Sequence, residues 1–137
     1  MISIFTGPVI NFTYGSTGTY LLYLRISEPI TIRIPKQEIT IDKGYYLYVG
    51  SAFGAGGLTS RIHRHLRRKK KNHWHIDQIT MSKHCSMHGI AAFLNEKIEC
   101  QIAQKLTVFD KIYCINNVGN SDCKNNCLSH LFKIEVN

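Results

Sequence analysis

The chain of 137 residues is long enough for one domain, and a composition of 44% hydrophobic against 19% charged residues excludes a disordered chain. Lysine and arginine outnumber acidic residues by 17 to 9, so the formal charge of +8 favours a polyanionic partner: nucleic acid, an acidic membrane surface or an acidic protein. No apolar run approaches the ~20 residues that span a bilayer, and the N-terminus does not resemble a signal peptide. We therefore expect a single domain over residues 1–137 that is cytoplasmic and has no membrane partner.

The first half of the chain predicts three strands. Residues Gly18–Ile26 are rich in β-branched and aromatic side chains, isoleucine alternates with polar residues in Ile30–Ile34, and residues 45–50 are again rich in tyrosine. Turn signals containing proline or glycine separate the three segments. Because short connections join neighbouring antiparallel strands, the pattern favours a three-stranded meander.

The second half predicts helices and further strands after a glycine-rich loop. A helix is expected from a cap at Thr59 or Ser60 to about residue 71, with Leu58, Ile62 and Leu66 as its apolar stripe. The segments that follow are expected to be a short helix, a strand, a helix, a polar loop and a final strand, at residues 74–80, 88–94, 95–106, 119–126 and 131–136. Together these elements predict an α+β fold with a central, mainly antiparallel sheet flanked by helices.

Four features follow one another along these elements. In chain order they are Gly18-Thr19-Tyr20, Tyr48-Val49-Gly50, Arg61 (with His65 one turn later) and Glu99. This order resembles the GIY-YIG nuclease superfamily, in which two tyrosine motifs on neighbouring strands precede a helical arginine and a later helical glutamate. Thr19 and Val49 stand where that family usually has isoleucine. The resemblance implies a metal-dependent endonuclease acting on DNA.

The residue types support the same chemistry on their own. Glu99 offers one hard carboxylate, which together with waters and phosphate oxygens is a normal environment for Mg²⁺ (or Mn²⁺). Arg61 offers a planar donor fork that suits phosphate. The resemblance implies that Tyr20 or Tyr48 activates a water, and since a phenol has a pKa of ~10, a nearby cation is needed. Which tyrosine is the base stays open; His65 could orient a phosphate or share the proton transfer.

Basic residues concentrate between residues 61 and 71, where seven of eleven positions are arginine or lysine. Such a run is often only a solvated face, but this one adjoins the expected site and favours contacts to a phosphate backbone. The residues that we expect to bind nucleic acid are Arg64, Arg67, Arg68, Lys70 and His73.

The next segment contains histidines on both sides of a tryptophan. His73 and His75 are two residues apart, so on a helix they could not both face the site, and we expect one of them to reach it. Trp74 and Ile76 are expected to be buried.

Longer stretches resemble one branch of the superfamily, an uncharacterised and largely archaeal family that is sometimes fused to endonuclease III. They are residues 44–52, 56–58, 64–67, 70–71, 73–77, 99–100, 121–123 and 129–132. The resemblance implies a place in DNA repair and a base-excision repair enzyme as partner. Lys111 stands near the place where many of the nucleases carry an asparagine, so a catalytically silent nucleic-acid-binding module is the alternative.

The 5 cysteines are an odd number, and without a secretory signal we expect reduced thiols. Cys123, Cys127 and His130 have ligand-like spacing for a structural zinc site, but a second close pair of ligands is missing, which favours buried thiols. A contact between Cys100 and Cys123, reduced or bridged, is a further alternative.

Overall fold

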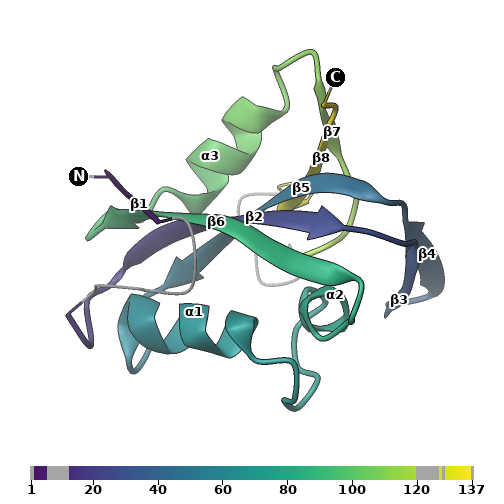
Figure 1. The fold of residues 1–137 in the computed structure, drawn as a ribbon. Helices are drawn as coiled ribbons and strands as arrows, with labels where there is room; N and C mark the ends of the chain where they lie inside the picture. Colours follow the sequence, from purple (N-terminus) through teal and green to yellow (C-terminus); the bar gives the residue numbers. More distant parts are fainter. Residues whose placement is uncertain (1, 6–12, 120–126, 128, 137) are drawn as a thin grey trace.

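The computed structural model describes residues 2–5, 13–119, 127 and 129–136. It confirms the predicted α+β class: one antiparallel sheet lies between helices on both of its faces (Figure 1). The strands of this sheet are, in spatial order, β1 (Ile2–Phe5), β6 (Cys85–Leu94), β2 (Gly18–Ile26), β5 (Gly44–Ala52), β8 (Leu131–Ile134) and β7 (Ile112–Cys114). Of these, β1 and β7 were not predicted, because each is short.

The predicted meander is wrong, because β3 (Ile30–Ile34) does not enter the central sheet. Instead β2 pairs directly with β5 over nine residues, and β3 folds back on β4 (Gln37–Ile41) as a separate two-stranded sheet. The sequence pattern missed β4 because its first residues are polar and exposed. Isoleucine side chains from both strands of the hairpin join the larger buried cluster and β3 contacts α2, so the hairpin extends the core rather than the sheet.

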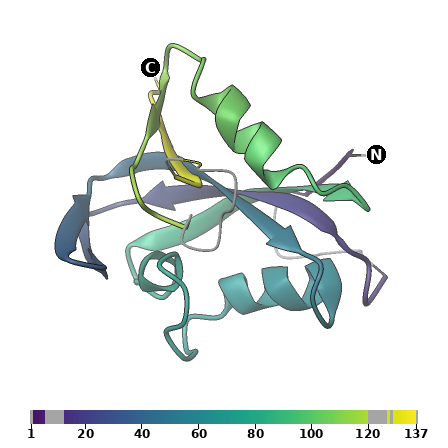
Figure 2. The ribbon, with the colours of Figure 1, turned by 180° about the vertical axis from the view of Figure 1, so that it is seen from behind.

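The helices lie on opposite faces of the sheet. Helices α1 (Gly57–Leu66) and α2 (Asp77–Thr80) cover one face and α3 (Glu99–Leu106) covers the other, as both ribbon views show (Figures 1 and 2). Two buried apolar clusters fill these layers, a larger one under α1 and α2 and a smaller one under α3. Among the described helices, none is both long and apolar enough to cross a membrane.

Four helix boundaries differ from the prediction, one of them the end of α1, which lies at Leu66 and not near residue 71. Helix α1 begins after Gly56, whose left-handed φ of 81° suits glycine, so Thr59 and Ser60 lie inside the first turn instead of capping it. Helix α2 is shorter than expected, and residues 74–76 form a turn before it. Helix α3 begins four residues later than predicted because the preceding segment is held as a loop by hydrogen bonds to β2.

The apolar stripe of α1 also ends differently. Leu58 and Ile62 are fully buried as predicted, but Leu66 is 38% exposed and His65 takes its place in the core. A spacing of seven residues keeps a side chain on the same face of a helix better than a spacing of eight does, since the period is 3.6 residues. The fold therefore buries a polar ring in the position where the sequence pattern predicted leucine.

A buried carboxylate, that of Asp77, holds the end of α1 and the following loop together. Asp77 accepts two hydrogen bonds from the Arg64 guanidinium (2.8 and 2.9 Å) and two from the backbone N–H groups of His73 and Trp74 (2.9 and 2.8 Å). Burial raises the pKa of Asp77, but these donors outweigh burial and leave its pKa below the usual value. The network explains why α1 ends at Leu66 and the chain turns back.

Replacing Asp77 tests this network. In Asp77→Ala, the partly buried Arg64 and two backbone N–H groups lose their acceptor, so we expect a loss of about 3 kcal/mol or more of unfolding free energy. Urea denaturation measures it. The control is Glu38→Ala, which removes an exposed ion pair with Arg33 (3.0 Å) and is expected to cost under about 1 kcal/mol. Equal losses in the two variants would contradict the structural role of Asp77.

Candidate functional site

An open edge of β5 creates a polar cleft. Strand β8 pairs with β5 from Tyr45 to Tyr48, and the Val49 N–H still donates to the His130 carbonyl (2.9 Å). In the described part of the chain, residues 50–52 of β5 have a strand neighbour only on the β2 side. Groups from both helical layers can reach this edge, and they enclose a cavity of about 580 Å³. Its lining residues are Tyr20, Tyr48, Gly50, Ser51, Phe53, Arg61, His73, Trp74, His75, Lys97, Glu99, Gly119 and His130.

The two tyrosines reach the cleft because of strand register. Tyr48 pairs with Leu22 and Gly50 pairs with Tyr20, and alternate residues of a strand point to one face, so both rings lie on the α1 face. Gly50 is required there: a Cβ at this position would lie 2.2 Å from the Tyr20 ring. The ring of Tyr20 therefore crosses β5 over its glycine.

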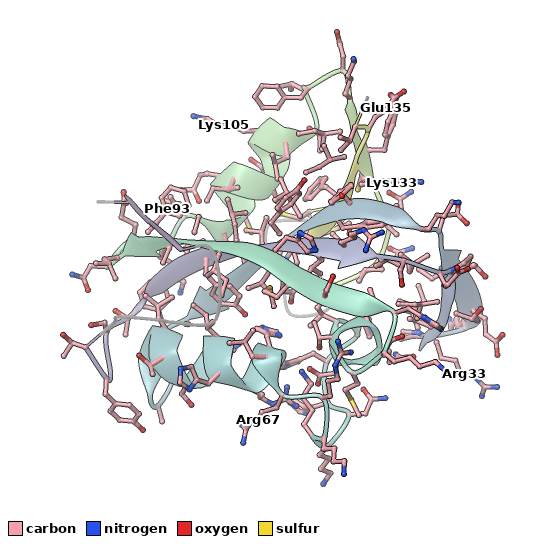
Figure 3. All side chains as sticks on the ribbon, in the orientation of Figure 1. Arg33, Arg67, Phe93, Lys105, Lys133 and Glu135 are labelled. Atoms are coloured by element: carbon pink, nitrogen blue, oxygen red, sulfur yellow. The ribbon has the colours of Figure 1, made fainter. Side chains whose placement is uncertain are left out.

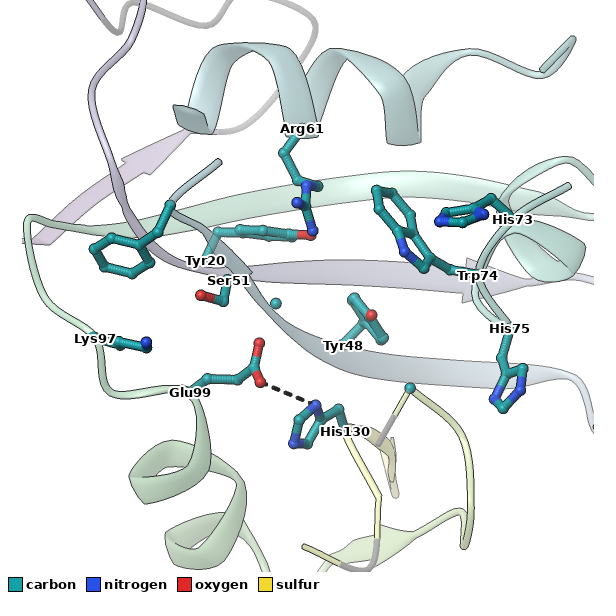
Figure 4. A pocket seen from close by; sticks show the side chains of 13 residues that line it. Tyr20, Tyr48, Ser51, Arg61, His73, Trp74, His75, Lys97, Glu99 and His130 are labelled. Atoms are coloured by element: carbon teal, nitrogen blue, oxygen red, sulfur yellow. Dashed lines mark ion pairs between the residues drawn. The ribbon is translucent and has the colours of Figure 1, made fainter. Parts of the chain in front are cut away.

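Arg61 and Glu99 enter the cleft from opposite sides, with the two tyrosines between them (Figure 4). Arg61 projects from α1, and Glu99 is the first residue of α3. The structure thus brings the four residues of the predicted quartet to one cavity, although Glu99 and Arg61 come from different faces of the sheet.

Thr19 fixes the segment that carries Glu99. The Thr19 hydroxyl donates to the Glu96 carbonyl (2.8 Å) and accepts from the Ile98 N–H (3.0 Å), and its side chain is fully buried. An isoleucine at this position would make neither hydrogen bond. Threonine in place of the usual isoleucine therefore has a structural role, because it ties the start of α3 to β2.

Trp74 packs against the core cluster without being fully buried, and its ring contacts two guanidinium groups. Its ring is 4.4 Å from the Arg61 Cζ and 4.3 Å from the Arg64 Cζ, distances typical of cation–π contacts. The side chain is half-buried and lines the cleft, whereas Ile76 is fully buried as predicted. Trp74 therefore aligns Arg61 with the cleft.

His73 and His75 both line the cleft, which corrects the expectation that only one could do so. That expectation assumed a helix, but these residues lie in an extended segment and a turn that precede the start of α2 at Asp77. The two backbone N–H groups bound to Asp77 shape this turn.

His65 lies beneath the cleft and does not line it. Its Nε2 is 2.7 Å from the Tyr20 hydroxyl, and its ring also packs against Tyr48 and Trp74. Burial, helped by the charge of Lys70, lowers the pKa of His65 to about 3, so the ring is neutral at physiological pH. His65 therefore supports the tyrosines from below.

Tyr20 keeps its proton in this environment. Burial and the neighbouring Tyr48 raise the pKa of Tyr20 well above its usual value, while the charge and hydrogen bond of Arg61 act against them. The neutral His65 cannot compete for this proton, since its own pKa is so low. Tyr20 is thus equipped to donate a hydrogen bond rather than to act as a base.

His130 is a cleft residue to which the sequence assigned no role in the cleft. Its Nδ1 lies 3.4 Å from Glu99 Oε1, and its side chain is 2% exposed. Burial lowers the pKa of His130, and a hydrogen bond with the Gly119 backbone opposes this shift. Ser51 and Lys97 were also missed, and no pattern in the sequence distinguishes them from ordinary surface residues.

Most of the residues expected to bind nucleic acid make contacts inside the protein. Arg64 binds Asp77, Arg68 donates to the carbonyls of Ser82 and Cys85, and Lys70 Nζ donates to two carbonyls of α1 and to Thr80. Arg67 is exposed and points away from the body of the protein (Figure 3). Whether these four residues also bind a phosphate backbone stays a prediction.

The fold and site together define a small α+β protein with a cationic cleft beside the part of β5 that β8 does not cover. The chain belongs to the family described as "Domain of unknown function DUF123", whose family model matches residues 19–137. Comparisons with curated proteins and with solved structures gave no match.

The buried His65 predicts a dependence of stability on pH. The folded-state pKa of about 3 is lower than the ordinary 6.5, so the unfolded chain binds more protons between these values and the protein loses stability as the pH falls through this window. We expect His65→Gln to reduce the loss between pH 6.5 and 4.5 by about 2 kcal/mol. Urea titrations at each pH measure it.

The control for this titration is His63→Gln, which alters an exposed residue of the same helix and is expected to leave the pH profile unchanged. A His65→Gln profile parallel to that of the unmodified protein would show that the ring does not stay neutral.

Proposed function

We propose that this protein is a metal-dependent endonuclease of the GIY-YIG type, which hydrolyses phosphodiester bonds of DNA in the β5 cleft. The observation that carries the proposal is the meeting of Arg61, Glu99 and two tyrosine hydroxyls in one cavity. A cation for phosphate, a carboxylate for a metal and hydroxyls for a water are the groups that phosphodiester hydrolysis needs. A role in DNA repair rests on the resemblance to the branch that is sometimes fused to endonuclease III.

The charge of the cleft supports an anionic substrate. Arg61 and Lys97 are its basic residues and Glu99 is the one acidic residue among those that line it. Phe53 is 40% exposed, with the Lys97 ammonium 5.8 Å from its ring centroid, so an aromatic surface adjoins the charged one. Nucleic acids present a phosphate beside a flat base, which fits such a pair.

The Glu99 carboxylate fits a hard divalent cation. Its side chain is 23% exposed and lines a cavity with room for waters and a phosphate, which matches the preference of Mg²⁺ or Mn²⁺ for a carboxylate and a partly retained hydration shell. A cation bound there would polarise a phosphate oxygen and stabilise the charge that develops on it.

The remaining residues position the reactants. Arg61, aligned by Trp74, would hold a non-bridging phosphate oxygen through its planar fork. Tyr20, whose proton is retained by burial, would donate a hydrogen bond, and its hydroxyl is fixed by His65 beneath it. Tyr48 is then the tyrosine that directs the attacking water. This assignment makes His65 a positioning residue.

Cleavage assays test the proposal. Plain, nicked, branched and abasic DNA are incubated with Mg²⁺ or Mn²⁺, and we expect cleavage to fall by at least ~100-fold in Glu99→Gln and Arg61→Ala, since each removes transition-state stabilisation. Tyr48→Phe is expected to lose more activity than Tyr20→Phe. The controls are Glu96→Gln and Arg33→Ala, which change exposed residues outside the cleft.

Two results would contradict the proposed nuclease activity. Cleavage that persists in Glu99→Gln would come from a contaminant. Salt-sensitive binding without cleavage on any of the four DNA forms would support the catalytically silent module instead.

Arg67 tests the contribution of the basic run to DNA binding. Its side chain is exposed and makes no hydrogen bond to another described residue, so Arg67→Ala is expected to weaken binding by several-fold and to reduce the slope of log K against log salt by about one. Fluorescence anisotropy at several salt concentrations measures this. Arg64→Ala is the comparison, because it is expected to destabilise the fold by releasing Asp77. An unchanged salt slope in Arg67→Ala would remove Arg67 from the interface.

A further inference from the structure

Two cysteines and a histidine from distant parts of the chain meet behind the cleft. Cys100, Cys127 and His130 each place one ligand atom within 4.8 Å of the other two, and all three are buried or half-buried. Cys100 is the second residue of α3, whereas the other two precede β8. Their spacing in the sequence grouped Cys127 and His130 with Cys123. Cys123 and any contact that it makes lie outside the described residues.

The imidazole of His130 has one nitrogen without a partner. Its Nε2 is buried and makes no hydrogen bond in the part of the chain that the structure describes. The other nitrogen, Nδ1, lies 3.4 Å from Glu99 Oε1, and the ring has a hydrogen bond with the Gly119 backbone. Histidine ligands of metals commonly donate the N–H that is not bound to the metal to a carboxylate or a carbonyl, and this ring has partners of both kinds in Glu99 and the Gly119 backbone. An unsatisfied buried nitrogen would otherwise be costly.

We propose that Cys100, Cys127 and His130 bind a zinc ion. Two thiolates and an imidazole are the donors that Zn²⁺ prefers, and two thiolates neutralise its charge in a buried place. A tetrahedral zinc site has neighbouring donors roughly 3.5–3.8 Å apart, so a donor set already within 4.8 Å needs only small side-chain movements. Binding releases two thiol protons, and one coordination position accepts water or a further donor.

The ion would join the start of α3 to the segment before β8. Cys100 follows Glu99 directly, and His130 contacts Glu99, so the zinc site fixes the carboxylate from two sides. This inference concerns a second, softer metal site than the one proposed at Glu99, and it stands on different residues.

Metal content tests the site directly. Protein purified without a histidine tag and without chelators is expected to contain about one zinc per chain by elemental analysis. Replacement by Co²⁺ is expected to give an intense near-ultraviolet thiolate-to-cobalt band, with tetrahedral visible bands. The wild-type spectrum needs no variant, so it stays informative even where a substitution prevents folding.

Matched variants locate the ligands. Cys100→Ser, Cys127→Ser and His130→Asn are expected to weaken zinc binding by at least tenfold, whereas Cys114→Ser, which alters another cysteine packed against the same apolar cluster, is expected to retain it. Arg61→Ala is expected to lose cleavage and keep zinc, so failure of the nuclease proposal is distinguishable from failure of this one. Reduced protein that takes up no zinc or Co²⁺, or mass spectrometry showing a Cys100–Cys127 disulfide in freshly purified protein, would overturn the inference.

Discussion

The short pairing of β8 along β5 is the constraint on which the cleft depends. A strand buried on both faces and paired on both edges offers no place for a ligand. Here the ladder ends at Tyr48 and one more hydrogen bond joins the Val49 N–H to the His130 carbonyl (2.9 Å), so that residues 50–52 have a paired strand, among the described residues, only on the β2 side. Groups from both helical layers can meet at that edge, which neither layer could provide alone. An arginine of α1 and a glutamate of α3 therefore share a cavity although the sheet separates their helices.

Buried polar groups hold this edge in shape. Asp77 binds Arg64 and the turn that carries His73 and Trp74, and Trp74 in turn packs on Arg61. Each contact is local, yet the chain of contacts runs from the core to the cleft. Burying a carboxylate is unfavourable unless it is paired, and the four donors around Asp77 offset its desolvation free energy. The guanidinium in the cleft is therefore set by an ion pair one turn further along the helix.

The sequence predicted the fold class because strand and helix patterns depend on short-range rules, whereas the quartet was inferred from the resemblance to the GIY-YIG superfamily. Period-two alternation places Tyr20 and Tyr48 on one face of neighbouring strands, and helical spacing buries Leu58 and Ile62. It failed where tertiary contacts override those rules. Polar residues of β4 form a strand because Ile41 and the isoleucines of β3 need a shared core. Single residues such as Lys97 reach the cleft only through the path of a loop, which no periodicity encodes.

The basic run between residues 61 and 71 also shows what the sequence could not predict, namely which of its side chains are bound inside the fold. Its charge predicts a polyanionic partner, but charge alone does not say which cations stay available. Arg64, Arg68 and Lys70 satisfy carboxylate and carbonyl groups where the chain turns after α1, and Arg67 remains exposed. The basic residues are continuous in sequence, but some of them stabilise the fold whereas Arg67 faces solvent.

The two proposed metal sites differ in their chemistry. The carboxylate of Glu99 suits a hard cation, and the thiols behind it suit a soft one. His130 touches both, so one imidazole would link the ion that stabilises the fold to the carboxylate that holds the other.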